Sequence, residues 1–146
     1  MLMMNRVFSI MAVAYILGIL VLPRLIPETA MVRIWNPYSL LHVPLYGALM
    51  VLLTFAFLPR LVDSKPFSFR PFSLLLPGGI ASLVGILDEV NQASIPHRDA
   101  SITDVFLDVA GIFLAALSIS YWQKRKKSNR GLKKTGQPET MQSPVL

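Results

Sequence analysis

Long runs of apolar residues with few charges dominate the pattern along this chain. Uncharged stretches of 17, 26, 17 and 15 residues follow Arg6, Arg33, Arg70 and Asp108. A helix needs about 20 mostly apolar residues to cross the hydrocarbon core of a bilayer. The pattern therefore predicts an all-α protein, a bundle of four transmembrane helices near residues 6–23, 40–58, 71–90 and 104–122.

The first of these segments has one feature of a signal peptide, because a basic residue precedes its apolar run. Pro23-Arg24-Leu25 follows the run, in place of a small-x-small cleavage site. We therefore expect the first helix to remain uncleaved as a membrane span.

The composition supports a membrane protein and excludes several other classes. Hydrophobic residues make up 53% of the chain and charged residues 15%, whereas a soluble domain usually carries about 25% charged residues. The absence of cysteine excludes disulfides, a thiol nucleophile and a Cys-based zinc site. The sequence contains no recognisable metal-binding motif and indicates no cofactor.

The basic residues predict the orientation of the bundle, because cytoplasmic loops collect Lys and Arg. If both termini are cytoplasmic, only Arg24, Arg33 and Arg98 of the 14 basic residues fall on the outer side. We therefore predict cytoplasmic N- and C-termini, a membrane domain over residues 1–122 and a disordered basic tail over 123–146. The tail has no aromatic residue on which a base could stack, so nucleic acid is not an expected partner.

The acidic residues gather in one short stretch of the sequence. Five of the eight lie in the predicted outer connection between the third and fourth helices and at the ends of those helices: Asp88, Glu89, Asp99, Asp104 and Asp108. The uncharged stretch after Asp108 spans only about 23 Å as a helix, less than the ~30 Å hydrocarbon core. The fourth helix must therefore begin earlier, with Asp108 at or below the outer interface.

The acids of the third helix fall in its last turns. The helix macrodipole disfavours negative charge at this end of the helix, where Asp88 and Glu89 lie. Placing ionisable groups at membrane depth also costs free energy. A cation, a hydrogen-bond donor or a bound proton should offset both costs.

Helical spacing predicts which residues face one another. Asp88 and Gln92 are four residues apart and share a face. Small residues four apart allow close helix contact, and two such pairs predict that the third and fourth helices pack together: Ala81 and Gly85, and Gly111 and Ala115. This packing would bring Asp88, Glu89 and Gln92 towards Asp104 and Asp108, with Arg98 as a counter-charge.

The second helix starts on the same side of the membrane. His42 and Tyr46 are four residues apart in its first turns, and Pro44 is tolerated there. Asp104 also fits a second interpretation, since Ser101-x-x-Asp104 matches a helix-capping pattern. The sequence therefore predicts one polar site in the outer leaflet, built by three helices.

These residues resemble a known family. His42, Tyr46, Asp88, Glu89, Gln92, Arg98, Asp104 and Gly111 follow the order His-x3-Tyr … Asp-Glu-x2-Gln-x5-Arg-x5-Asp-x6-Gly, similar over residues 38–120 to the VanZ-like family of small bacterial membrane proteins. The resemblance implies a four-helix, multi-pass protein of the bacterial plasma membrane. It also implies a link to glycopeptide antibiotic resistance through the member that names the family. This chain has Tyr38-Ser39, His97 and Asp108 where many members have an acid-Lys pair, Gly and Asn.

Three functions fit the sequence. The first is a binding protein of the cell envelope, whose partners are membrane lipids and a lipid-linked or cell-wall ligand or an envelope protein. The alternative is a membrane-embedded enzyme that acts on a lipid or phosphate-bearing substrate with help from carboxylates or a cation. An ion-coupled carrier fits less well, because the inner halves of the predicted helices hold no acid.

Overall fold

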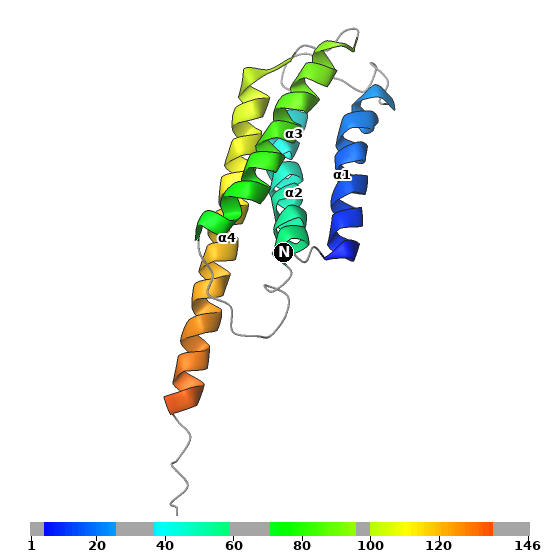
Figure 1. Ribbon diagram of the computed structural model, residues 1–146. Helices are drawn as coiled ribbons and strands as arrows, with labels where there is room; N and C mark the ends of the chain where they lie inside the picture. The colour runs from blue at the N-terminus through cyan, green and yellow to red at the C-terminus, as the bar shows by residue number, and fades with distance from the viewer. Residues whose placement is uncertain (1–4, 26–36, 59–70, 96–99, 136–146) are drawn as a thin grey trace, which may run out of the picture.

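The computed structural model describes residues 5–25, 37–58, 71–95 and 100–135, and within these ranges every regular element is helical. The four long helices lie side by side and alternate in direction (Figure 1). They are α1 (Arg6–Leu25), α2 (His42–Phe57), α3 (Leu75–Ala93) and α4 (Ile102–Thr135), and short 3-10 turns η2 (Pro37–Leu41) and η4 (Pro71–Leu74) precede α2 and α3. The all-α prediction is confirmed for the described residues.

Three segments are long and apolar enough to cross a membrane: Arg6–Leu25, Ser39–Phe57 and Ile102–Lys126. They match three of the four predicted spans. Large apolar side chains cover the outside of these segments instead of filling a core, as Ile10, Phe106 and Phe113 illustrate. Such a surface suits hydrocarbon and not water, so we describe the chain as a membrane protein.

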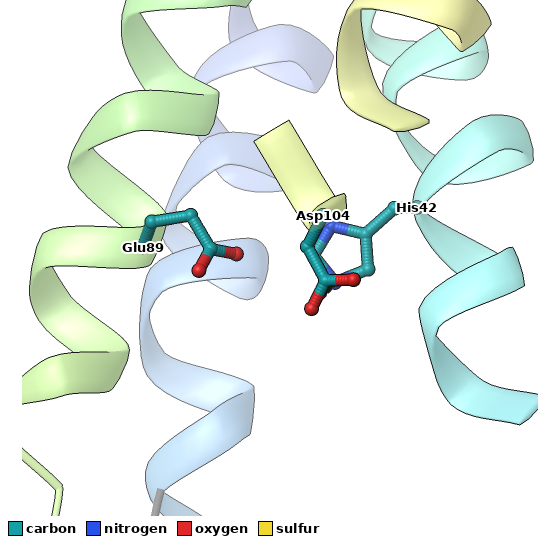
Figure 2. Close-up of side chains that lie close together, drawn as sticks. All are labelled: His42, Glu89 and Asp104. Atoms are coloured by element: carbon teal, nitrogen blue, oxygen red, sulfur yellow. Dashed lines mark ion pairs between the residues drawn. The ribbon is translucent and has the colours of Figure 1, made fainter. Parts of the chain in front are cut away.

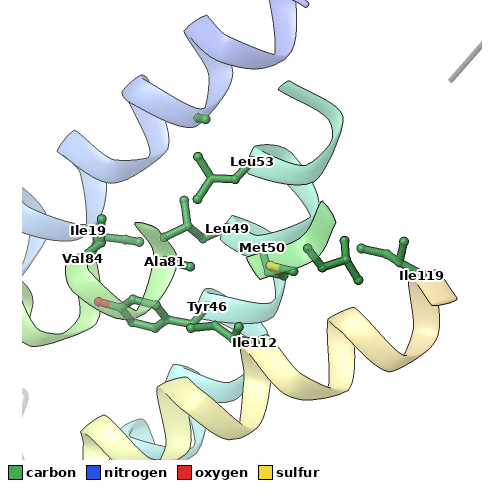
Figure 3. Close-up of a cluster of buried hydrophobic side chains, with 11 residues drawn as sticks. Ile19, Tyr46, Leu49, Met50, Leu53, Ala81, Val84, Ile112 and Ile119 are labelled. Carbon is green, nitrogen blue, oxygen red and sulfur yellow. The ribbon is translucent and has the colours of Figure 1, made fainter. Parts of the chain in front are cut away.

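Helix α2 is the centre of the bundle and contacts each of the other three helices. Its inward side chains meet those of α1, α3 and α4 in one apolar cluster (Figure 3). Tyr46, Leu49 and Met50 of α2 are fully or almost fully buried within this cluster. Lipid tails are as apolar as Leu, so close van der Waals packing and hydrogen bonds hold such a bundle together.

Hydrogen bonds between side chains and carbonyl groups join α1 to the bundle. The Tyr15 hydroxyl donates to the Leu45 carbonyl at 3.1 Å, and Asn91 of α3 donates to the Leu20 carbonyl at 2.8 Å. Near the end of α1, Arg24 donates to the Asn91 side-chain oxygen at 2.6 Å. These bonds place the end of α1 beside the end of α3.

The small residues pack differently from the sequence prediction in one respect. A Cβ at Gly85 would lie 2.6 Å from Asp108 Oδ2, so α3 does approach α4 closely there. Gly111, however, abuts the backbone carbonyl of Val43 on α2, and its own carbonyl oxygen lies 3.4 Å from where a Cβ at Gly47 would be. The prediction that Gly111 packs against the third helix is therefore wrong, because the closest backbone approach is between α2 and α4.

The other two predicted packing residues lie in or beside the apolar cluster. Ala81 is fully buried in it, and Ala115 is partly buried against it. Both residues therefore contribute to the apolar packing of the bundle.

Helix α4 continues well past the membrane segment, and Figure 1 shows it extending beyond the other three helices. The prediction of a disordered tail is therefore wrong for residues 123–135, while residues 136–146 lie outside the described residues. Gln, Lys and Arg are good helix formers, and extending an existing helix avoids a new nucleation step. Arg125 and Lys126 also lie 5.0 and 4.9 Å from the ring centroids of Tyr121 and Trp122.

The contact between Gly111 and Val43 generates a test of the bundle. A Gly111→Ala substitution should destabilise the protein by about 1–3 kcal/mol, because its Cβ would overlap the Val43 carbonyl. The measurement is unfolding of the purified protein by sodium dodecyl sulfate, followed by circular dichroism.

Gly79→Ala is the matched control, because no heavy atom lies within 4 Å of a Cβ at that position. The control should leave stability unchanged or raise it by up to about 1 kcal/mol, since alanine has a higher helix propensity than glycine. Equal stability of the two variants would contradict the close approach of α2 and α4.

Candidate functional site: a buried polar centre

Seven polar side chains collect at one end of the bundle, where α1 and α3 end and α2 and α4 begin. We call this group the polar centre: His42 and Tyr46 on α2, Asp88, Glu89 and Gln92 on α3, and Asp104 and Asp108 on α4. All except His42 are buried, and His42 is half-buried. The sequence prediction that three separate helices contribute to one polar site thus corresponds to the arrangement in the structure.

A short contact in the polar centre joins α2 to α4. His42 Nδ1 lies 2.7 Å from Asp108 Oδ1, and only 1% of the Asp108 side chain is exposed. With Asp108 ionised, the carboxylate accepts this hydrogen bond and the imidazole donates its Nδ1 proton. This hydrogen bond fixes the ring, which also stacks on Tyr46 at a centroid distance of 6.0 Å.

The other oxygen of Asp108 lies against α3. The Cβ that Gly85 lacks would sit 2.6 Å from Asp108 Oδ2. Glycine at this position therefore makes room for a carboxylate, and a larger residue would push Asp108 away from His42.

Asp88 is held by donors from two helices. Its Oδ2 accepts hydrogen bonds from the Gln92 side chain at 3.0 Å and from the Tyr46 hydroxyl at 3.3 Å. The predicted pairing of Asp88 with Gln92 across one helical turn is present, and Tyr46 adds a link to α2.

Glu89 links the end of α3 to the start of α4. Its Oε2 accepts the backbone N–H of Ser101 at 2.7 Å, and Ser101 Oγ in turn accepts the backbone N–H of Asp104 at 3.4 Å. Ser101 thus caps α4, as its sequence pattern indicates. In a reciprocal capping box the Asp104 carboxylate would take the Ser101 N–H, but Glu89 takes it instead.

Asp104 is consequently available to face the interior of the polar centre. Its Oδ2 lies 4.0 Å from His42 Nε2. One potential ligand atom from each of His42, Glu89 and Asp104 lies within 4.8 Å of the other two. Figure 2 shows these three side chains converging from α2, α3 and α4.

Three carboxylate oxygens in the polar centre have no hydrogen-bond partner within the described part of the chain: Glu89 Oε1, Asp104 Oδ1 and Asp108 Oδ2. A buried acceptor without a partner costs about 1–3 kcal/mol, and more when it is charged. These oxygens therefore favour a positively charged or hydrogen-donating group near them.

The residues near the polar centre differ in part from those that the sequence predicts. Arg98, the predicted counter-charge, lies outside the described residues. The backbone of Ser101 and the side chain of Asn91 contribute contacts that the sequence prediction missed. The capping pattern signals Ser101, whereas no local signal identifies Asn91, because its partners Leu20 and Arg24 are remote in sequence.

Comparisons with known proteins give no further guide. No family model, curated protein or solved structure matches this chain.

The bond between His42 and Asp108 generates a quantitative test. A double-mutant cycle of His42→Ala and Asp108→Ala should give a coupling free energy of about 1.5–3 kcal/mol, because each single change leaves a buried charged partner. The measurement is the detergent-unfolding free energy of the four proteins.

Ser118→Ala supplies the control pair. The Ser118 hydroxyl bonds to the Leu114 carbonyl of its own helix and lies about 15 Å along α4 from Asp108. Its change should add to that of His42→Ala within about 0.5 kcal/mol. Additivity in the His42 and Asp108 cycle as well would show that the two side chains do not interact.

Proposed function

We propose that this chain is a four-span protein of the bacterial plasma membrane, VanZ-like, whose polar centre binds the head group of a lipid-linked or cell-wall ligand in the outer leaflet. One observation carries the proposal. Buried carboxylates from the bundle meet at one of its ends, and some of their oxygens have no hydrogen-bond partner within the described part of the chain. A chain that used these acids only for packing would gain nothing from keeping acceptors unpartnered.

The surface of α3 supports its assignment as the fourth span. Its polar side chains Asp88, Glu89 and Gln92 are buried, which lowers the mean hydropathy of the helix without making its surface polar. Its exposed side chains are apolar along one face: Leu76, Leu83, Ile86, Leu87 and Val90. At 19 residues it is about 28 Å long, close to the thickness of the hydrocarbon core.

The distribution of basic residues supports the orientation. Arg125 and Lys126 are the last residues of the segment Ile102–Lys126 and lie over the rings of Tyr121 and Trp122. Aromatic side chains beside cationic ones are typical of a membrane interface. The positive-inside bias assigns this end to the cytoplasm. The polar centre, at the opposite end of α4, then belongs to the outer leaflet.

A specific contact favours a second function, that of a membrane-embedded hydrolase. His42 is oriented by Asp108 through Nδ1 and presents Nε2 to the interior of the site, as a general base oriented by a carboxylate does. The nucleophile would be water, because the hydroxyl oxygens of Tyr46 and Ser101, which hydrogen-bond to the site, are engaged with Asp88 and with the Asp104 backbone N–H.

Single cysteines test the orientation directly, because the chain has none of its own. Ala100→Cys and Ser128→Cys introduce exposed thiols on either side of the membrane segment of α4. A membrane-impermeant maleimide should label the first in intact cells and the second only after the membrane is disrupted. The reverse labelling pattern would place the polar centre on the cytoplasmic side and contradict the proposal.

Head-group binding is tested with protein in phosphatidylcholine nanodiscs. The probes are a fluorescent phosphatidylethanolamine and a polyprenyl-phosphate sugar, whose head groups offer both donors and phosphate. Glu89→Gln and Arg98→Ala should weaken binding of at least one probe tenfold or more, whereas Glu139→Gln, which removes an acid beyond α4 in the sequence, should not.

Two outcomes count against the binding function. Unchanged affinity of both variants for both probes would remove the polar centre from ligand binding. Release of a product from either probe, lost on His42→Gln, would favour the hydrolase.

A further inference from the structure

One potential ligand atom from each of α2, α3 and α4 converges inside the polar centre. The atoms belong to His42, Glu89 and Asp104 and lie within 4.8 Å of one another. His42 Nε2 and Asp104 Oδ2 are 4.0 Å apart. Zinc binds nitrogen and carboxylate oxygen at about 2.0–2.2 Å in a tetrahedral arrangement, so two ligand atoms of one ion lie about 3.4 Å apart. Rotations of these side chains would have to bring the three atoms closer together around an ion.

We propose that His42, Glu89 and Asp104 bind one divalent cation, and that Asp108 positions His42 for this role. Figure 2 shows the three ligands pointing towards a common centre from three helices. The site is therefore formed only when α2, α3 and α4 are packed together.

Glu89 gives independent support for a ligand at this point. Only 5% of Glu89 is exposed, and while Oε2 accepts the Ser101 N–H, Oε1 has no partner within the described part of the chain. The carboxylate points towards Asp104 and His42 (Figure 2). A buried carboxylate is rarely left with one oxygen unused, and a cation at the centre would use it.

The imidazole has the orientation that a metal ligand needs. In the neutral tautomer that donates Nδ1–H to the buried carboxylate of Asp108, Nε2 carries the lone pair, and this nitrogen lies 4.0 Å from Asp104 Oδ2. Metal-binding histidines almost always donate their other ring N–H to a carboxylate, a carbonyl or water. The bond between His42 and Asp108 is thus the outer-shell contact that such a site requires.

Charge balance also favours a dication. Glu89, Asp104 and Asp108 surround one imidazole in a site buried among helices that cross hydrocarbon. Two hydrogen-bond donors, the backbone N–H of Ser101 and Nδ1 of His42, stabilise only part of this negative charge. Ionised carboxylates in such a setting are paired or bound to a metal.

The ligand set selects the kind of ion. One imidazole nitrogen with two carboxylate oxygens suits Mn²⁺ or Zn²⁺ better than Mg²⁺ or Ca²⁺, which prefer oxygen alone. Three protein ligands leave at least one coordination position open. If the proposed function holds, an oxygen of the head-group phosphate fills that position, which explains how an acidic site binds an anionic ligand.

The test uses the full-length protein in nanodiscs, washed with a chelator and titrated with Mn²⁺ under electron paramagnetic resonance. One Mn²⁺ per chain should bind, and Zn²⁺ should displace it whereas Mg²⁺ at the same concentration should not. Glu89→Gln and Asp104→Asn should weaken Mn²⁺ binding at least tenfold, and Asp108→Asn, which alters only the positioning contact, should weaken it about 10–100-fold.

Glu139→Gln, the matched carboxylate-to-amide control, should bind Mn²⁺ as the unaltered chain does. Absence of binding by the unaltered chain overturns the cation site whether or not the variants fold. Binding that persists in Glu89→Gln and Asp104→Asn places the ion elsewhere and overturns it equally.

The same preparation separates this inference from the proposed function. Head-group binding that survives chelation, without Mn²⁺ binding, retains the proposed function and rejects the cation. Mn²⁺ binding without head-group binding retains the cation and rejects the proposed ligand.

Discussion

The packing of the helices is governed by carboxylates buried beside one imidazole, that of His42, at one end of the bundle. Asp108 is almost completely buried and bonds His42 across the interface of α2 and α4. For that bond to form, α2 and α4 must approach closely, and Gly111 and Gly47 permit the approach. The polar contact and the backbone contact therefore determine the same helix pair.

The third helix is fitted to this pair by two further features. Gly85 leaves space for the Asp108 carboxylate, and Glu89 binds the backbone N–H of Ser101 at the start of α4. The second contact closes the short connection between α3 and α4 and turns Asp104 inwards. Local helix capping and the geometry of the polar centre are thus parts of one arrangement.

The remainder of the bundle keeps the polar centre away from lipid. Tyr46 lies between the centre and the apolar cluster, with its ring stacked on His42 and its hydroxyl bonded to Asp88. Below it, Leu49 and Met50 are buried in the apolar cluster. Large apolar side chains are exposed on α1, α3 and α4, which suits a membrane, and the polar centre lies at one end of the bundle.

The helices, their alternating directions and the clustering of polar residues at one end could all be predicted from the sequence. Apolar runs of span length and acids confined to one connection suffice for this, because a helix has a fixed rise and side chains four apart share a face. The exposed hydrophobic surface and the inward polar side chains of α3 likewise follow from its spacing. The end of α4 was misjudged, because a basic composition rich in good helix formers does not distinguish a helix from a disordered tail.

Which polar groups meet could not be predicted from the sequence and is seen only once the helices are packed together. That Asp108 bonds His42, that Glu89 replaces Asp104 as the partner of Ser101, and that Gly111 packs against α2 all depend on how the helices rotate about their axes. Sequence spacing gives the face of a helix but not the neighbour it meets. That choice follows from summed packing and electrostatic contacts between segments far apart in the chain.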